Sequence, residues 1–128
     1  MTNLLKVSAV DGTKPIGPYS PGIAAGGFLF ISGQVGLDPQ SGQLVSGGIE
    51  KQCEQALHNL GTILNAGGSS FAQVVKVEVF LKNMDDFAVL NRVYQRFFTQ
   101  EPYPARCAVE VSRMPLGALV EIAATSLR

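Results

Sequence analysis

The sequence predicts an α+β domain in which a mixed β-sheet carries two helices packed on one face. Apolar residues alternate along several short segments, as in strands, whereas residues 49–66 and 87–98 repeat them at spacings of three and four, as in amphipathic helices. The segments follow one another as strands, helix, strand, helix and two strands, an order typical of α+β domains. A chain of 128 residues with 46% hydrophobic residues is the size of one core, so we expect a single domain over residues 1–128.

The first third of the chain is predicted to form strands around a shaped loop. Residues 4–9 resemble a short strand, and the following segment DGTKPIGPYSPG contains three prolines and three glycines, which disfavour a regular element. This loop contains Tyr19. Residues 23–34 indicate a hairpin that turns at Gly26-Gly27. Its second strand, residues 28–32, is so uniformly apolar that we expect it to be buried on both faces.

The remaining elements follow from the same periodicities. We predict a helix over residues 49–66 that ends before Gly67-Gly68, and a strand over residues 71–81. Asn83 and Asp86 are plausible capping residues for a second helix. Its apolar stripe would be Phe87, Leu90, Val93, Tyr94, Phe97 and Phe98. Two final strands are predicted over residues 105–111 and 118–124.

Two opposite charges on these final strands form the candidate functional centre. Alternation turns Arg106 away from Cys107, and it turns Glu121 away from Val120 and Ile122. An arginine can hold a carboxylate through two parallel charge-assisted hydrogen bonds, a geometry that lysine cannot match. Arg106 is therefore a candidate anchor for a small α-keto or α-imino acid.

Each of the two charges also has a purely structural interpretation. Arg106 could pack its stem and pair with Glu110 or Glu121. Glu121 could be a general base, could position a water molecule, or could only neutralise Arg106. Periodicity leaves these alternatives open.

The sheet face opposite the helices is predicted to be too apolar to stay in contact with water. It would carry Val74 and Phe80 or their alternates, together with Ala108, Leu119 and Ala123. Self-association would cover such a face, and the two charges would then lie near the edge of the interface.

Other polar residues are weaker candidates. Tyr19 lies in a Pro-Gly-rich loop, where its phenol could donate a hydrogen bond or simply be exposed, and Asn91 lies at the margin of the second helical stripe. Cys53 and Cys107 suit buried free thiols, and no second cysteine or histidine lies at ligand spacing, so we expect no metal site. We expect His58 to be a solvated residue on the polar side of its helix.

Charge and hydropathy exclude several kinds of partner. Ten basic and ten acidic side chains give a net charge of zero, so no global field attracts nucleic acid or an anionic membrane. The sequence contains neither a signal-like segment nor an apolar run of membrane-spanning length. We therefore expect a soluble, cytoplasmic protein with no nucleic-acid or membrane partner.

Four motifs resemble those of one family. They are GPYSPG (17–22), FISGQVGLDPQSG (30–42), DDFAVLNRVYQRFF (85–98) and PARCAVEVSRMPLGALVEIAA (104–124). Together they resemble the RidA/YjgF family of small enamine/imine deaminases, over nearly the whole chain.

The resemblance implies a fold and an activity. It implies a chorismate-mutase-like α+β fold and a homotrimer whose sheets form a central β-barrel, with three active sites between subunits. It also implies hydrolysis of 2-aminoacrylate/2-iminopropanoate and 2-iminobutanoate to 2-oxo acids and ammonia, which would protect enzymes that depend on pyridoxal phosphate. The family uses no metal and no organic cofactor.

The resemblance also implies roles for individual residues. Arg106 matches the family's carboxylate-binding arginine and Glu121 its water-positioning glutamate. Tyr19 and Asn91 match further polar site residues, and Gly33 matches the backbone that lines the pocket.

Two positions depart from the family pattern. Many members have cysteine where this chain has Ala108, so that its own Cys107 stands one position earlier, and we expect the backbone there to contact substrate. Many members also have a second acid where this chain has Ala123.

Two other functions remain open at this point. One is a non-catalytic regulatory trimer that binds a 2-oxo acid through Arg106 and turns nothing over. The other is RNA cleavage or translational inhibition, which the neutral charge makes the weakest of the three.

Overall fold

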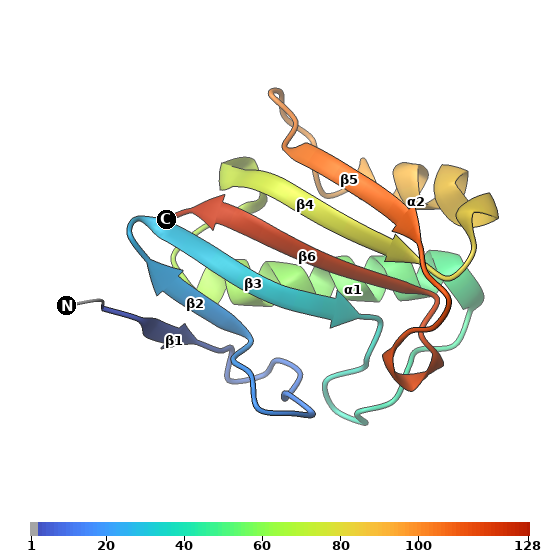
Figure 1. The fold of residues 1–128 in the computed structure, drawn as a ribbon, viewed down its shortest axis with the longest axis horizontal. Helices are drawn as coiled ribbons and strands as arrows, with labels where there is room; N and C mark the ends of the chain where they lie inside the picture. Colours follow the sequence, from blue (N-terminus) through green and yellow to red (C-terminus); the bar gives the residue numbers. More distant parts are fainter. Residues whose placement is uncertain (1–2) are drawn as a thin grey trace.

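The computed structural model describes residues 3–128 as one mixed sheet with two helices behind it (Figure 1). The strands are β1 (Leu5–Val7), β2 (Gly22–Ala25), β3 (Phe28–Val35), β4 (Val74–Leu81), β5 (Ala105–Glu110) and β6 (Val120–Leu127). The helices are α1 (Gly48–Ala66) and α2 (Phe87–Tyr94), with short 3-10 turns at Phe71–Gln73, Met84–Asp86 and Pro115–Gly117. The predicted α+β class, with a mixed sheet and two helices, is confirmed.

The strand order explains why both helices cover the same face. The sheet runs β1-β2-β3-β6-β4-β5, and only β4 and β5 are a parallel pair. Strand β6 is antiparallel to both β3 and β4, so β3 and β4 run in the same direction as each other. Helix α1 therefore connects β3 to β4, and α2 connects β4 to β5, with both steps in one direction across the sheet. Right-handed crossovers in one direction place their helices on one face.

The β2–β3 hairpin forms as predicted. Gly26 and Gly27 make its two-residue turn with φ of 58° and 82°, the left-handed conformation that glycine adopts without steric cost. The prediction that β3 is buried on both faces is wrong for the single chain. Leu29 and Ile31 are buried toward the helices, whereas Phe28 and Phe30 are 39% and 48% exposed on the other face.

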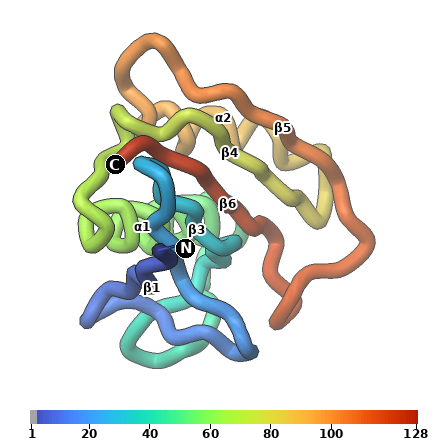
Figure 2. Tube along the Cα trace, turned by 60° about the vertical axis from the view of Figure 1, so that its left-hand side comes forward, coloured from blue at the N-terminus to red at the C-terminus, as the bar shows by residue number. Residues whose placement is uncertain are grey.

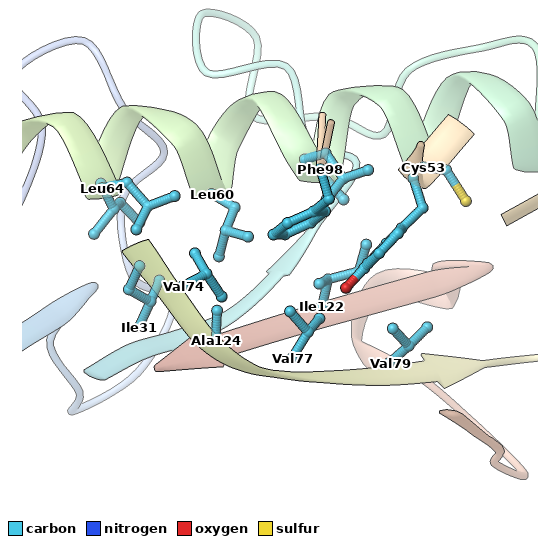
Figure 3. Close-up of a cluster of buried hydrophobic side chains, with 14 of the residues drawn as sticks. Ile31, Cys53, Leu60, Leu64, Val74, Val77, Val79, Phe98, Ile122 and Ala124 are labelled. Carbon is cyan, nitrogen blue, oxygen red and sulfur yellow. The ribbon is translucent and has the colours of Figure 1, made fainter. Parts of the chain in front are cut away.

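A continuous apolar core fills the space between the sheet and the helices (Figure 3). Helix α1 contributes Cys53, Leu60 and Leu64, which face Val77 and Ile122 of the central strands. Burial of one such large apolar side chain contributes about 1.5–3 kcal/mol, so this cluster is what holds the helices on the sheet. The stripe predicted for α1 is confirmed.

Several predicted boundaries shift. Residues 71–73 form a 3-10 turn before β4, and α2 ends at Tyr94, although Phe98 still reaches the core from the turn after it. Asn83 accepts a hydrogen bond from the backbone N–H of Asp85, whereas the side chain of Asp86 caps nothing in residues 3–128. Strand β6 continues to Leu127 because it pairs with β3 as far as Phe28.

The composition of the open sheet face, the one away from the helices, differs in part from the prediction. Phe80 and Ala123 lie on it, but Ala108 packs against the core on the helix side. Cys107, which we expected to be a buried thiol, is exposed on the open face. Within residues 3–128 neither helix has the length and apolar character needed to cross a membrane.

Candidate active site

Arg106 lies on the helix side of β5, over the aromatic side chains of α2. It pairs in register with the buried Val77 of β4 and so points to the same face. Its Nη1 donates a 2.9 Å hydrogen bond to Oδ1 of Asn91, and its guanidinium carbon lies 4.8 Å from the ring centre of Tyr94 and 5.5 Å from that of Phe87. The aromatic faces and one amide therefore fix the planar guanidinium group without neutralising it.

The ion pair considered for Arg106 is not formed. Among residues 3–128 no carboxylate lies within ion-pair distance of Arg106, and Oε1 of Glu110 instead accepts a hydrogen bond from the backbone N–H of Met84. Arg106 borders a cavity of about 290 Å³. The other lining residues are Asn91, Tyr94, Gln95, Phe98, Tyr103 and Pro104. The guanidinium group thus keeps donors available for an external anion.

The ring of Tyr94 lies against the guanidinium group of Arg106. Its ring stacks on Phe98 with centroids 4.3 Å apart, and burial raises the pKa of its phenol to about 12. Its hydroxyl is buried and has no hydrogen-bond partner within residues 3–128. The tyrosine therefore serves Arg106 through its ring rather than through its hydroxyl.

Glu121 lies on the opposite face of the sheet. Its neighbours Val120 and Ile122 are fully buried under the helices, so alternation along β6 turns Glu121 toward the open face. The register between β3 and β6 shifts between Ile31 and Gln34, and this bulge brings Gly33 against the carboxylate. A Cβ on Gly33 would lie only 2.7 Å from Cδ of Glu121, so only glycine leaves room for the acid.

The surroundings of Glu121 disfavour its charged form. Burial of the carboxylate raises the pKa of Glu121 above its usual value. Glu121, Gly33 and Tyr19 all line a cavity of about 360 Å³. The other lining residues are Thr13, Lys14, Pro15, Ile16, Pro21, Ser32, Gln34, Val35, Leu37, Pro115 and Leu116. We call this space the Glu121 cavity.

Hydrogen bonds attach the N-terminal loop to β3 and so build one wall of the Glu121 cavity. The hydroxyl of Ser32 donates a 2.6 Å hydrogen bond to the carbonyl of Ser20, next to Tyr19. The buried amide of Gln34 accepts from the hydroxyl of Thr13 at 3.3 Å and donates to the carbonyl of Ser32 at 3.0 Å. The loop that carries Tyr19 is therefore fixed to the strand that carries Gly33.

The segment between β5 and β6 forms another wall. In Figure 2 it loops out in orange and red on the side away from α1. Leu116 of this segment lines the Glu121 cavity and has φ of 61°, a left-handed conformation that costs a non-glycine residue about 1–2 kcal/mol. Such strain at a cavity wall is typical of functional sites.

The two predicted charges do not share one site within the chain. We expected Arg106 and Glu121 near the edge of the same interface, but they lie on opposite faces and β4 separates their strands. Asn91 groups with Arg106, whereas Tyr19 and Gly33 group with Glu121. The chain therefore carries two half-sites, one cationic and one acidic.

The cysteines and His58 lie outside both cavities. Cys53 is buried in the core, and burial raises the pKa of its thiol to about 12. Cys107 follows Arg106 but points to the open face, and His58 is exposed with its ring edge-on to Phe97. Within residues 3–128 no three histidine, cysteine or acidic side chains form a group able to hold a metal ion.

Sequence reasoning missed four residues of the half-sites. Tyr94 was assigned to the core stripe only, and Gln34 and Lys14 were given no role. Leu116 was also overlooked. The Gln34 amide could have been suspected, because a glutamine within an apolar strand is buried at 6% exposure only with hydrogen-bond partners. A loop lysine carries no such signal.

Comparison with known proteins gives one family and several close relatives. The family described as endoribonuclease L-PSP matches residues 10–127. A RutC family protein of Pyrococcus horikoshii is 52% identical over 118 residues, which cover 92% of this chain and 93% of the relative. A human protein named 2-iminobutanoate/2-iminopropanoate deaminase is 41% identical over 130 residues, covering all of this chain and 94% of the relative.

Solved structures agree with the fold. The crystal structure of RidA from an Antarctic Psychrobacter bacterium superposes with a TM-score of 0.92 at 38% identity, covering 97% of this chain and 99% of that one. The relatives thus carry different functional names on one fold.

Proposed function

Because this chain belongs to the endoribonuclease L-PSP family, which is the YjgF/RidA family, we propose that it hydrolyses reactive enamines and imines to 2-oxo acids and ammonia. The proposed substrates are 2-aminoacrylate, its tautomer 2-iminopropanoate, and 2-iminobutanoate, which enzymes dependent on pyridoxal phosphate release. The protein would act in the cytoplasm and protect such enzymes from these products.

The environment of Glu121 is the observation that carries this proposal. Its carboxylate packs against Gly33 in a cavity beside the phenol of Tyr19, and burial raises its pKa. An acid whose pKa moves toward neutrality can accept a proton from water and return it to a leaving amine. Imine hydrolysis needs both transfers.

The Arg106 half-site supports the other requirement, which is substrate binding. The guanidinium group is oriented by Asn91 and Tyr94 and retains donors for an anion. A bidentate pair with the substrate carboxylate would fix the imine carbon in one position, which favours attack by a bound water.

We further propose that a homotrimer completes the site by bringing Arg106 of one chain to Glu121 of its neighbour. Among residues 3–128 no acidic side chain lines the Arg106 cavity, and no arginine lines the Glu121 cavity. The open face also exposes large apolar side chains, among them Phe28, Phe30 and Val109 at 39%, 48% and 44%, and self-association would cover them.

The proposed reaction proceeds without a covalent enzyme intermediate. Glu121 accepts a proton from a water molecule as the water oxygen bonds to the imine carbon, and the C=N electron pair takes up a proton from solvent to form a carbinolamine. Protonated Glu121 then gives its proton to the amino nitrogen, and the C–N bond breaks with its electron pair going to nitrogen. Ammonia leaves as the hydroxyl group releases its proton to solvent and its oxygen becomes that of the ketone. Tyr19 lines the same cavity, and its phenol would hydrogen-bond the water or the nitrogen.

A coupled assay tests the proposal. A threonine or serine dehydratase generates the imine in situ, and formation of the 2-oxo acid is followed with and without this protein. We expect acceleration by the wild type and loss of acceleration in Glu121→Gln and Arg106→Ala. Equal rates with and without the wild type would overturn the proposal.

The same variants distinguish the non-catalytic alternative. A regulatory protein that only binds 2-oxo acids would give no acceleration, would bind 2-oxobutanoate, and would lose that binding in Arg106→Ala but not in Glu121→Gln. RNA cleavage is less favoured, because a net charge of zero supplies no general attraction for phosphates.

A further inference from the structure

The Glu121 cavity is larger than a three- or four-carbon acid requires. Its volume of about 360 Å³ lies within the roughly 300–1,000 Å³ typical of sites for drug-sized ligands. Beyond Glu121 and Tyr19 the lining continues over apolar residues, including Ile16 and Leu37. The cavity therefore has room for a substrate side chain that extends away from the reacting carbon.

Lys14 is the only cationic side chain among the described residues that line this cavity. It is exposed, and within residues 3–128 no carboxylate lies at ion-pair distance from its ammonium group. Its charge is thus available to a ligand. The loop that carries it is tied to β3 through Thr13, the preceding residue, which donates to Gln34.

A second cavity adjoins the first at Lys14. Figure 1 shows the loop before β2 and the loop after β3 beside each other, and the second cavity lies between them. Thr13, Lys14, Ile16 and Leu37 line both spaces, so Lys14 lies where the two cavities adjoin. A ligand that extends from Glu121 toward the second cavity therefore comes close to Lys14.

Asp38 places a negatively charged side chain in the second cavity. It lines the second cavity, and its carboxylate accepts a 2.8 Å hydrogen bond from the backbone N–H of Gln40. An anionic group would be attracted by Lys14, which lines both cavities, and repelled by Asp38, which lines only the second. The arrangement favours a negative charge beside Lys14 and disfavours one within the second cavity.

We propose that Lys14 makes this site selective for 2-imino dicarboxylic acids and their 2-oxo products, by binding the distal carboxylate. The proposal rests on the proposed function for the position of the reacting end. A lysine supplies a point charge, so recognition would tolerate some variation in chain length. Arg106 would hold the carboxylate next to the imine, and Lys14 the one at the other end.

Binding of two matched ligands tests the selectivity without requiring turnover. The probes are 2-oxoglutarate and 5-methyl-2-oxohexanoate, in which an isopropyl group replaces the distal carboxylate, measured by calorimetry on the full-length protein. We expect 2-oxoglutarate to bind about tenfold more tightly to the wild type, which is the strength of one charge-assisted hydrogen bond. The preference should weaken as salt increases.

Variants of Lys14 assign the preference to one side chain. Lys14→Met should abolish the tenfold ratio while leaving binding of 5-methyl-2-oxohexanoate unchanged, and Lys14→Arg should retain the ratio. Lys82→Met is the matched control, because Lys82 is also exposed and lines neither cavity. In the imine assay, Lys14→Met should raise KM for the imine of glutamate much more than KM for 2-iminobutanoate, whereas Lys82→Met should change neither.

Failure of this inference is distinguishable from failure of the proposed function. Acceleration with 2-iminobutanoate but equal affinity for the two probes would overturn the selectivity alone. No acceleration with any imine, together with a Lys14-dependent preference for 2-oxoglutarate, would overturn the deaminase and leave the selectivity standing. A preference that survives in Lys14→Met would assign it to another residue and refute the inference.

Discussion

Glu121 is held in surroundings that favour its neutral form, and this has a consequence for stability. Burial raises its pKa in the folded chain, so the folded protein binds this proton more tightly than the unfolded protein does. Its contribution to stability is therefore greatest below the ordinary glutamate pKa of about 4.3, and it declines as pH rises through the folded pKa. At neutral pH the charged side chain is a net cost to folding.

We predict that Glu121→Gln raises the melting temperature at pH 7 while it abolishes activity. The amide keeps the shape of the side chain but removes the charge that burial disfavours. Melting curves of wild type and variant at pH 7 and pH 4 test this. The difference between their melting temperatures should be smaller at pH 4, because protonation of Glu121 in the wild type removes the same charge. A variant less stable than wild type at pH 7 would contradict it.

Tyr94 is a second residue whose buried polar group affects stability. We predict that Tyr94→Phe stabilises the protein by about 1 kcal/mol, because it removes a buried hydroxyl that lacks a partner within residues 3–128. The ring that lies 4.8 Å below Arg106 remains, so activity should be kept. Denaturant unfolding measures the change, with Tyr103→Phe as control because Tyr103 is 56% exposed. A loss of stability in Tyr94→Phe would indicate that the hydroxyl is hydrogen-bonded.

At the scale of the elements, the bulge in β3 determines where Glu121 can be. The shift in register between Ile31 and Gln34 lets the strand pass close to β6, and Gly33 occupies the point of approach. The side-chain amide of Asn59 on α1 donates to the carbonyls of Val35 and Leu37 at 3.1 and 2.9 Å and so fixes the end of the strand. The buried face of α1 therefore helps to hold the acidic half-site in shape.

We predict that Gly33→Ala lowers kcat by at least about tenfold, because a misplaced catalytic group loses the benefit of orientation. The new methyl group would lie 2.7 Å from Cδ of Glu121 and would force the carboxylate to move. Gly17→Ala is the control, since a methyl group there meets only the ring of Tyr19 at an ordinary 3.7 Å. Steady-state kinetics with 2-iminobutanoate compare the two, and equal activities would show that the bulge does not position Glu121.

The sequence was sufficient to predict the helices and strands but not how they are placed relative to one another. Alternation correctly set Arg106 opposite Cys107 on β5, and Glu121 opposite Ile122 on β6. It could not reveal that Arg106 and Ala108 face the helices, because the opposite side of β5, with Cys107 and Val109, is the more apolar one. Nor could it reveal that β4 lies between the two strands. The two charges were therefore predicted on one interface and are found on opposite faces.

The orientation of loop residues could not be predicted, for a different reason. Lys14 and Leu116 lie in segments without a hydrophobic period, so nothing in the sequence indicates which way they point. Strand alternation and loop composition made Arg106 and Tyr19 candidates, but only the resemblance of four motifs to a known family gave them roles. Physical reasoning alone left each of them with a structural alternative.

At the scale of the whole molecule, the proposed trimer makes a prediction that no single chain could satisfy. Arg106→Ala removes one half-site and Glu121→Gln the other, so each variant alone should be inactive. Mixed trimers, formed by co-expression or by unfolding and refolding together, would contain interfaces in which one chain supplies an intact Arg106 and its neighbour an intact Glu121. Random assembly of equal amounts should restore about a quarter of the wild-type activity, because a cyclic trimer containing both variants has one intact site in three.

The recovery separates two explanations of the divided site. If catalysis used both half-sites of one chain, no chain in the mixture would carry both residues, and mixing would restore nothing at any ratio. If one chain supplied all the chemistry through Glu121 alone, Arg106→Ala would be active before mixing. Only a site shared between neighbouring chains gives inactive variants that recover on assembly, and the recovery should disappear when the trimer is diluted until it dissociates.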